Sequence, residues 1–172
     1  MSDCKAAGYI GLRQTTEQDC EFLYFVYAST RAEEMALTGW SETEVDSFLR
    51  SQFQYQDIYY KQNYPSASYD MILAGDIPIG RLYVDRKPEK MNIIDIALLP
   101  QYRGQGVGGR IFRELLKEAD QKGQIVSLHV EMNNPIRSFY FSLGFVEINS
   151  YGIYYHMERP VSGRAYHAGT TA

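Results

Sequence analysis

Apolar residues recur along this chain with two periods, one of three to four residues and one of two residues. The longer period is typical of amphipathic helices, and it follows two capping-box signals at residues 16–19 and 41–44. The first predicted helix carries Phe22, Leu23, Val26 and Tyr27 on one face, and the second carries Val45, Phe48, Leu49 and Phe53 toward Tyr60. A short loop at residues 38–40 separates the two helices.

The period of two predicts strands at residues 9–13, 68–74, 77–85 and 92–99. Gly75 and Asp76 predict a tight hairpin between the second and third of these strands. The polar residues 87–90 predict another short turn before the fourth strand. Three consecutive strands with short turns indicate an antiparallel meander.

The second half of the chain returns to alternating helices and strands. Val107, Ile111, Leu115 and Ala119 predict a third helix that ends at Gly123, and a strand follows at residues 124–130. Asn134 and Pro135 form a predicted N-cap and first helical position for a fourth helix ending at Gly144. Two strands at residues 145–148 and 154–158 complete the pattern. A meander joined to a strand–helix–strand unit predicts an α/β fold, a mixed sheet with helices on its faces.

Length and composition narrow the class of protein. The 172 residues predict one domain over residues 1–160, and the small and polar residues 161–172 predict a disordered tail. A formal net charge of −4 without clusters of basic residues argues against a nucleic-acid partner. Cys4 and Cys20 show no metal or redox spacing, which predicts a reduced, cytoplasmic protein. Residues 1–8 hold no signal-peptide core and no run reaches membrane-spanning length, so we expect no membrane association.

The most informative segment is the glycine-dense turn at residues 101–108, between an apolar strand and the third helix. Glycines there allow backbone N–H groups to approach a ligand closely, and the start of a helix adds partial positive charge. Such a turn is suited to binding a pyrophosphate.

Two common phosphate motifs fit this turn poorly. The glycines at 104, 106 and 109 match the spacing of a dinucleotide-binding Rossmann turn, and Glu131 lies where a ribose-binding acid would belong. However, only 41 residues follow Glu131, too few for the rest of a doubly wound domain. A P-loop is disfavoured further, because no Gly-Lys-Ser/Thr follows the glycines.

Two further sequence motifs occur together in this chain. Gln101, Gly104 and Gly106 match the acetyl-CoA signature Q/R-x-x-G-x-G/A, and Asn134, Tyr140, Gly144 and Phe145 match a second signature at the usual separation. From about residue 91 to residue 145 the chain therefore resembles the GNAT superfamily of N-acetyltransferases. The resemblance implies a mostly antiparallel mixed sheet of six to seven strands flanked by about four helices, with a splay between the fourth and fifth strands.

The resemblance also implies acetyl-CoA as cosubstrate and no metal. The pantetheine arm would follow the backbone of the fourth strand, and the pyrophosphate would meet the N–H groups that follow it. The implied cofactor-binding residues are Ala97, Leu98, Leu99, Arg103, Gly104, Gln105, Gly106, Val107, Gly108 and Asn134.

The implied chemistry is attack of a neutral amine on the thioester carbonyl. The family assigns protonation of the departing thiolate to the tyrosine matched by Tyr140, and the Leu98 N–H is a candidate oxyanion donor. Tyr140 also lies on the apolar stripe of its helix, so a purely structural role is the alternative. If Tyr140 is the acid, we expect its phenylalanine variant to keep acetyl-CoA affinity and lose most of kcat.

The general base is where the sequence departs from many family members. Asn92, an amide, stands where several relatives have a glutamate, so Asp95 becomes the nearest carboxylate for a base or an amine-binding group. His129, Glu131 or a chain of waters are the alternatives. Arg137 replaces a commonly small residue, and a surface position is favoured over a contact with the 3′-phosphate of CoA.

The acceptor site of this family is built by the first two helices, their loop and the last strands. Those segments hold the aromatic residues Trp40, Tyr55, Tyr59, Tyr151 and Tyr154 and the acids Glu33, Glu34 and Glu42. A surface of aromatic and acidic side chains suits a cationic amine of a small molecule or a peptide, although similar surfaces occur at homodimer interfaces. The alternative function is a non-catalytic acyl-CoA-binding regulatory module.

Overall fold

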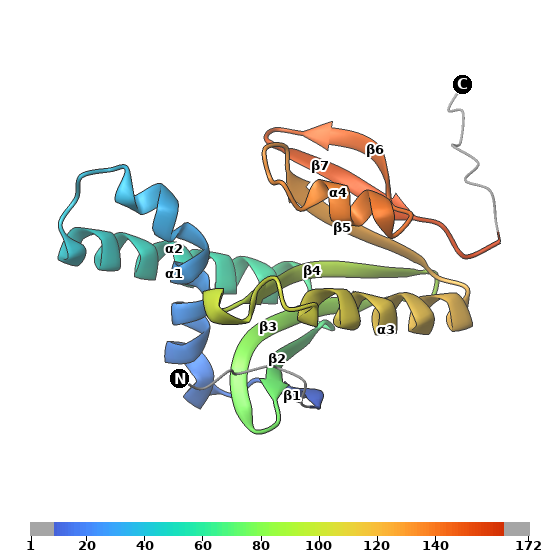
Figure 1. The fold of residues 1–172 in the computed structure, drawn as a ribbon, viewed down its shortest axis with the longest axis horizontal. Coiled ribbons are helices and arrows are strands. Elements are labelled where there is room, and N and C mark those ends of the chain that lie inside the picture. Colours follow the sequence, from blue (N-terminus) through green and yellow to red (C-terminus); the bar gives the residue numbers. More distant parts are fainter. Residues whose placement is uncertain (1–8, 164–172) are drawn as a thin grey trace. The chain divides into compact units, whose positions relative to one another are not determined.

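The computed structural model describes residues 9–163 and contains one seven-stranded mixed sheet in the order β1-β2-β3-β4-β5-β7-β6 (Figure 1). The predicted six to seven strands and four helices of an α/β fold are confirmed. The elements are β1 (Ile10–Gln14), η1 (Glu17–Asp19), α1 (Cys20–Ala36), α2 (Glu42–Asn63), β2 (Ser68–Ala74), β3 (Ile77–Arg86), β4 (Lys90–Leu98), η2 (Pro100–Tyr102), α3 (Val107–Lys122), β5 (Ile125–Glu131), α4 (Arg137–Ser142), β6 (Val146–Tyr151) and β7 (Tyr154–Arg159).

The described part of the chain divides into two compact units, and each unit is built from two separate stretches of the sequence. The first comprises residues 9–83 and Asp95–Gly109, and the second comprises Val84–Ile94 and residues 110–163. Strands β3 and β4 and helix α3 each contribute residues to both units. Residues 1–8, including Cys4, and residues 164–172 of the predicted tail lie outside the described residues.

The first unit is organised by its two capped helices. Both predicted capping boxes are present: Thr16 and Asp19 close the 3₁₀ turn η1 that leads into α1, and Ser41 and Glu44 cap α2. The apolar faces of the helices meet in a buried cluster of Leu23, Tyr24, Tyr27, Leu49 and Phe53. Strands β1 and β2 pair antiparallel from Ile10–Ala74 to Gln14–Asp70.

The second unit contains the parallel step of the sheet. The pairing of β4 with β5 runs from Lys90–Ile125 to Ile93–Leu128, and the next residues, Ile94 and His129, are not paired with each other. This early end of the ladder agrees with the expected splay between the fourth and fifth strands. Strand β7 pairs antiparallel with β5 and with β6, so that these three strands lie side by side in Figure 1.

Helix α3 ends as its sequence predicts. Gly123 has φ of +66°, its N–H donates to Asp120 O, and the Gln124 N–H donates to Ala119 O. These two bonds form a Schellman motif, which satisfies carbonyls that the last turn would leave unpaired.

The predicted start of the fourth helix is wrong by two residues. Helix α4 begins at Arg137, whereas Asn134 and Pro135 form a separate turn before it. Asn134 Oδ1 accepts a bond from the Ile136 N–H at 3.1 Å, and Asn134 O accepts one from the Arg137 N–H. The asparagine therefore caps the preceding turn instead of the helix. Smaller differences affect strand ends: β4 starts at Lys90, and the sixth strand runs from Val146 to Tyr151.

Candidate functional site

The glycine turn is held open by left-handed backbone at two positions. Gly104 has φ of +70° and Gly106 has φ of +80°, which residues with a Cβ adopt only at a cost. A Cβ at either glycine would meet no heavy atom within 4 Å, so conformation and not crowding requires glycine here. Both residues are exposed, and the buried Val107 anchors the start of α3. Consecutive N–H groups in such a turn form a concave site for an anion.

Arg103 connects this turn to two other elements of the first unit. Its backbone N–H donates to Pro100 O, so the amides available to a ligand begin at Gly104. Its Nε donates to Leu98 O at 2.7 Å, and its Nη2 donates to Ser29 Oγ at 3.0 Å. The end of β4 and the middle of α1 are therefore joined by one guanidinium.

The candidate pantetheine-binding strand is tightly packed against β3. An ideal Cβ at Gly80 would lie 2.3 Å from Ala97 O and 2.9 Å from Leu98 Cδ2. The Leu99 N–H donates to Ile79 O at 2.9 Å. Glycine at position 80 thus permits a close backbone approach at Ala97 and Leu98.

Asp95 lies in an ion pair with an almost completely buried arginine. The Nη2 of Arg81 donates to Asp95 Oδ2 at 2.6 Å and to Gln56 Oε1 at 2.9 Å, and the Arg81 side chain is 3% exposed. The guanidinium carbon lies 5.3 Å from the ring centre of Tyr83, and burial raises the pKa of Tyr83 to about 12. The buried guanidinium of Arg81 needs a carboxylate partner, and Asp95 supplies it.

The residues of the second motif belong to the second unit. Tyr140 is 7% exposed, and its ring contacts those of Phe112 and Phe145 at centroid distances of 5.4 and 5.8 Å. Asn134 forms the turn described above. The aromatic contacts explain the burial of Tyr140 structurally and leave its catalytic role as a hypothesis.

Asn92, which stands at the position of the glutamate of several relatives, and the remaining candidates for the base all have partners within the fold. Asn92 Oδ1 accepts a bond from Ser127 Oγ. His129 and His156 face each other across β5 and β7 with ring centres 4.9 Å apart. Burial, the second imidazole and Lys90 lower the pKa of His129, and burial and Lys90 lower that of His156. Glu131 is the last residue of β5 and pairs with Tyr154.

Arg137, for which a phosphate contact was the weaker alternative, is engaged within the second unit. It forms an ion pair with Glu147, and its guanidinium carbon lies 4.2 Å from the ring centre of Tyr155. These contacts leave the Arg137 side chain half-buried, whereas the sequence favoured a surface position.

Two cavities of the first unit border α1 and α2. One, of about 690 Å³, lies between the helices and includes the predicted acceptor residues Trp40 and Glu42 in its wall. The predicted residues Tyr55 and Tyr59 are exposed on α2 and, like Glu33 and Glu34, do not line it. Tyr151 and Tyr154 belong to the second unit and are also exposed.

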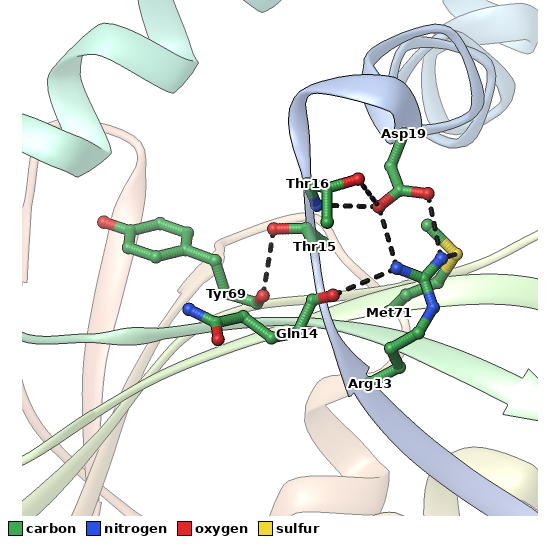
Figure 2. Close-up of polar contacts among 7 residues, drawn as sticks. All are labelled: Arg13, Gln14, Thr15, Thr16, Asp19, Tyr69 and Met71. Carbon is green, nitrogen blue, oxygen red and sulfur yellow. Dashed lines mark hydrogen bonds and ion pairs between the residues drawn. The ribbon is translucent and has the colours of Figure 1, made fainter.

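The other cavity, of about 480 Å³, is lined by more polar residues near the end of β1, among them Gln14, Thr15, Thr16 and Tyr69. Figure 2 shows the polar contacts at this end, where the two terminal guanidinium nitrogens of Arg13, Nη1 and Nη2, donate to the Asp19 carboxylate at 3.0 and 2.9 Å. Hydrogen bonds from Arg13 and Thr16 hold the pKa of Asp19 far below its usual range. These contacts fix the start of η1 and α1.

Within residues 9–163, no group of three or more His, Cys, Asp or Glu side chains is arranged to hold a metal ion. No helix in that range is long and apolar enough to cross a membrane.

Sequence reasoning missed three residues of this region: Gly80, Arg81 and Ser29. Each matters through a contact with a residue far away in sequence, Ala97, Asp95 and Arg103 respectively. The charge of Arg81 between the apolar residues at 77–79 and 82–84 was the one available signal, because a buried arginine requires an anionic partner.

Comparisons with known proteins agree with this geometry. A sequence model of the Acetyltransferase (GNAT) family matches residues 28–145. No curated protein sequence matches significantly. Among solved structures, the PaiA N-acetyltransferase of Thermoplasma acidophilum in complex with coenzyme A aligns with a TM-score of 0.66 and 23% identity, over 88% of this chain and 99% of that one.

Two further solved structures have a similar fold. The ribosomal-protein-S18-alanine N-acetyltransferase of Escherichia coli aligns with a TM-score of 0.63 and 17% identity, over 91% of this chain and 97% of that one. An acetyltransferase of Thermus thermophilus aligns with a TM-score of 0.63 and 19% identity, over 88% and 97% of the two chains.

Proposed function

Since the chain belongs to the GNAT acetyltransferase family, we propose that it transfers the acetyl group of acetyl-CoA to a primary amine of a small molecule or peptide. The observation that carries this proposal is the exposed turn from Gly104 to Gly106, which has two left-handed glycines and leads directly into α3. Both halves of the family signature, around Gly104 and around Tyr140, are present in addition.

In this proposal the backbone of the turn binds the diphosphate of the cosubstrate. The N–H groups of Gly104, Gln105, Gly106, Val107 and Gly108 supply donors and the positive end of the helix dipole. The backbone of Ala97, Leu98 and Leu99 binds the pantetheine arm, except that the Leu99 N–H is already bonded to Ile79 O. Asn134 is assigned to the cofactor from its motif position.

The thioester supplies an acyl carbon that an amine can attack. The amine nitrogen forms the new C–N bond, the C–S bond breaks, and the proton lost by the amine passes to a base. Leu98 N–H stabilises the developing oxyanion, and the Tyr140 hydroxyl gives a proton to the leaving sulfur. Both roles rest on motif position.

We assign Asp95 to electrostatic binding of the amine rather than to removal of the amine proton. Its Oδ2 is bonded to Arg81, and accepting a proton there would weaken an ion pair with a buried guanidinium. A water chain to solvent then serves as the base. The homodimer and the cytoplasmic location indicated by the sequence stay predictions.

Calorimetry with acetyl-CoA, followed by detection of free thiol with a panel of amines, tests the proposal. We expect Gly106→Ala to weaken acetyl-CoA binding, because alanine disfavours φ of +80° and reorients the amides. Gly75→Ala is the matched control, since Gly75 has φ of +60° and equally open space but lies in the β2–β3 hairpin. Unchanged acetyl-CoA affinity in Gly106→Ala, or binding without thiol release for any amine, contradicts the proposed function.

A further inference from the structure

Arg81 lies where several elements of the first unit meet. From its place in β3, its Nη2 donates both to Asp95 Oδ2 on β4 at 2.6 Å and to Gln56 Oε1 on α2 at 2.9 Å. Its guanidinium carbon lies 5.9 Å from the ring centre of Tyr27 on α1. Its Nε is buried and has no hydrogen-bond partner among residues 9–163. The guanidinium is therefore oriented toward Asp95 and Gln56 even though another donor stays unpaired.

The charges around Arg81 balance within this cluster. The titratable side chains that surround the guanidinium on α1, α2 and β3 are the tyrosines Tyr27, Tyr60 and Tyr83. Burial raises the pKa of Tyr83 to about 12, so its hydroxyl is uncharged near pH 7. Asp57 on α2 also acts on Tyr83, and it is paired with Lys61 at 2.7 Å. Arg81 and Asp95 therefore form an ion pair without net charge.

The carboxylate is the more accessible end of this ion pair. The Asp95 side chain is 16% exposed, against 3% for Arg81. Asp95 precedes Ala97 by two residues and Leu98 by three, which corresponds to about 7 and 10 Å along a strand. A charge at Asp95 therefore acts through space on an amine near the Leu98 N–H. The guanidinium behind it opposes that action.

This opposition matters because a primary amine has two forms. The ammonium ion cannot attack a thioester, whereas the uncharged amine can. A carboxylate without a compensating charge would stabilise the bound ammonium ion about three- to tenfold at such distances. The enzyme would then hold more of its acceptor in the form that does not react.

We propose that Arg81 is a positioning residue that, together with Gln56, holds Asp95 in an ion pair without net charge, so that the acceptor site does not favour the unreactive ammonium form of its amine. This inference rests on the proposed acetyl transfer and concerns how the acceptor is bound. The accessible end of the pair still attracts the amine, and Arg81 limits the strength of this attraction. Arg81 itself neither touches the acceptor nor transfers a proton.

Gln56→Glu tests this inference without removing a partner of Arg81. The substitution keeps the size of the side chain and an acceptor for Nη2, and it adds one negative charge to the cluster. Arg81→Met is less suitable, because it would leave Asp95 unpaired and is expected to impair folding. Gln54→Glu is the matched control, since it makes the same change at an exposed position of α2.

Steady-state kinetics of both variants are measured from about pH 7 to about pH 10.5, a range that includes the pKa of a simple amine. The acceptor is the monoamine that releases most thiol in a panel that includes butylamine and benzylamine. Near pH 7, Gln56→Glu should lower both KM for the amine and kcat about threefold, because it stabilises only the bound ammonium ion. The ratio kcat/KM should stay constant, since it depends on the free enzyme and the free amine. Above the pKa of the amine, Gln56→Glu should behave like the parent protein.

The outcomes separate this inference from the proposed function. A fall in kcat/KM in Gln56→Glu that Gln54→Glu does not share would indicate a merely structural role and overturns the inference. Unchanged KM and kcat near pH 7 overturn it as well, and in both cases acetyl transfer stands. If no amine releases thiol from acetyl-CoA, the transfer itself is contradicted and the role of Arg81 in acceptor binding falls with it.

Discussion

Replacing Gly80 by alanine tests whether β4 must lie where the structure has it. The added Cβ would lie 2.3 Å from Ala97 O, 2.9 Å from Leu98 Cδ2 and 3.1 Å from Leu98 Cα. The leucine tip can turn away, but the carbonyl belongs to the backbone of β4. Since ordinary contacts between carbon and carbonyl oxygen begin at about 3.3 Å, that oxygen must move by roughly 1 Å.

Two opposing contributions determine the stability of Gly80→Ala. Alanine restricts the unfolded chain more than glycine does, which adds about 0.4–1 kcal/mol to the free energy of unfolding. This gain applies at position 80 because its backbone has no left-handed φ. Overpacking a rigid site lowers the free energy of unfolding by about 1–3 kcal/mol, which exceeds this gain. We therefore expect a net loss of about 1–2 kcal/mol in the free energy of unfolding, measured by urea denaturation. Displacement of Ala97 and Leu98 should also weaken acetyl-CoA about three- to tenfold in calorimetry, roughly the effect of one lost hydrogen bond.

Gly11→Ala is the matched control for this experiment. It makes the same change in β1, where the nearest atom to the new Cβ belongs to the ring of the exposed Tyr9, at 3.0 Å. That ring can rotate away, so stability and acetyl-CoA affinity should stay near those of the parent protein. The reasoning is refuted if Gly80→Ala is as stable as Gly11→Ala and binds acetyl-CoA equally well.

Three further predictions concern Tyr140, the pair of His129 and His156, and Asp120. Tyr140→Phe should retain its ring contacts and acetyl-CoA affinity but lose roughly 10²-fold or more in kcat; steady-state kinetics showing less than about a threefold loss would exclude the general-acid role. The pKa values of His129 and His156 are lowered in the folded protein from the ordinary histidine value of 6.5. As the pH falls through 6.5, the unfolded chain therefore binds more protons than the folded protein, and the free energy of unfolding should decrease. Urea denaturation from pH 8 to pH 5 should show this slope, and replacing both histidines by glutamine should reduce it. Hydrogen bonds from Arg159 lower the pKa of Asp120 to about 2, so its stabilisation is present above about pH 4 and is lost as pH falls toward 2. Asp120→Asn should cost about 1–2 kcal/mol at pH 7 and nearly nothing near pH 2, and an equal cost at both values would contradict the assignment.

Local features could be predicted well because their causes are local. Both capping boxes, the hairpin at Gly75 and the end of α3 at Gly123 depend on interactions among residues a few positions apart. The start of α4 was misplaced, because the Asn134–Pro135 signature also suits the isolated turn that Asn134 closes through Ile136 N–H. The sequence identified the glycines of the turn at residues 101–108 only as positions that allow a close approach of a ligand, whereas the left-handed backbone of Gly104 and Gly106 came from the structure.

The sequence alone therefore determined the order of elements, the family signatures and the turn proposed for the diphosphate, since each depends on spacing along a short segment. Only the tertiary structure decided the partners around them. Asp95 meets Arg81 across 14 residues, and Arg103 meets Ser29 across 74. The pocket between α1 and α2 likewise arises from the packing of the two helices and the loop that joins them, which buries Tyr24 and Leu49 and leaves Phe25 and Trp40 exposed. Periodicity tells which face of a helix is apolar, but the residues that meet across a contact depend on how the elements pack together.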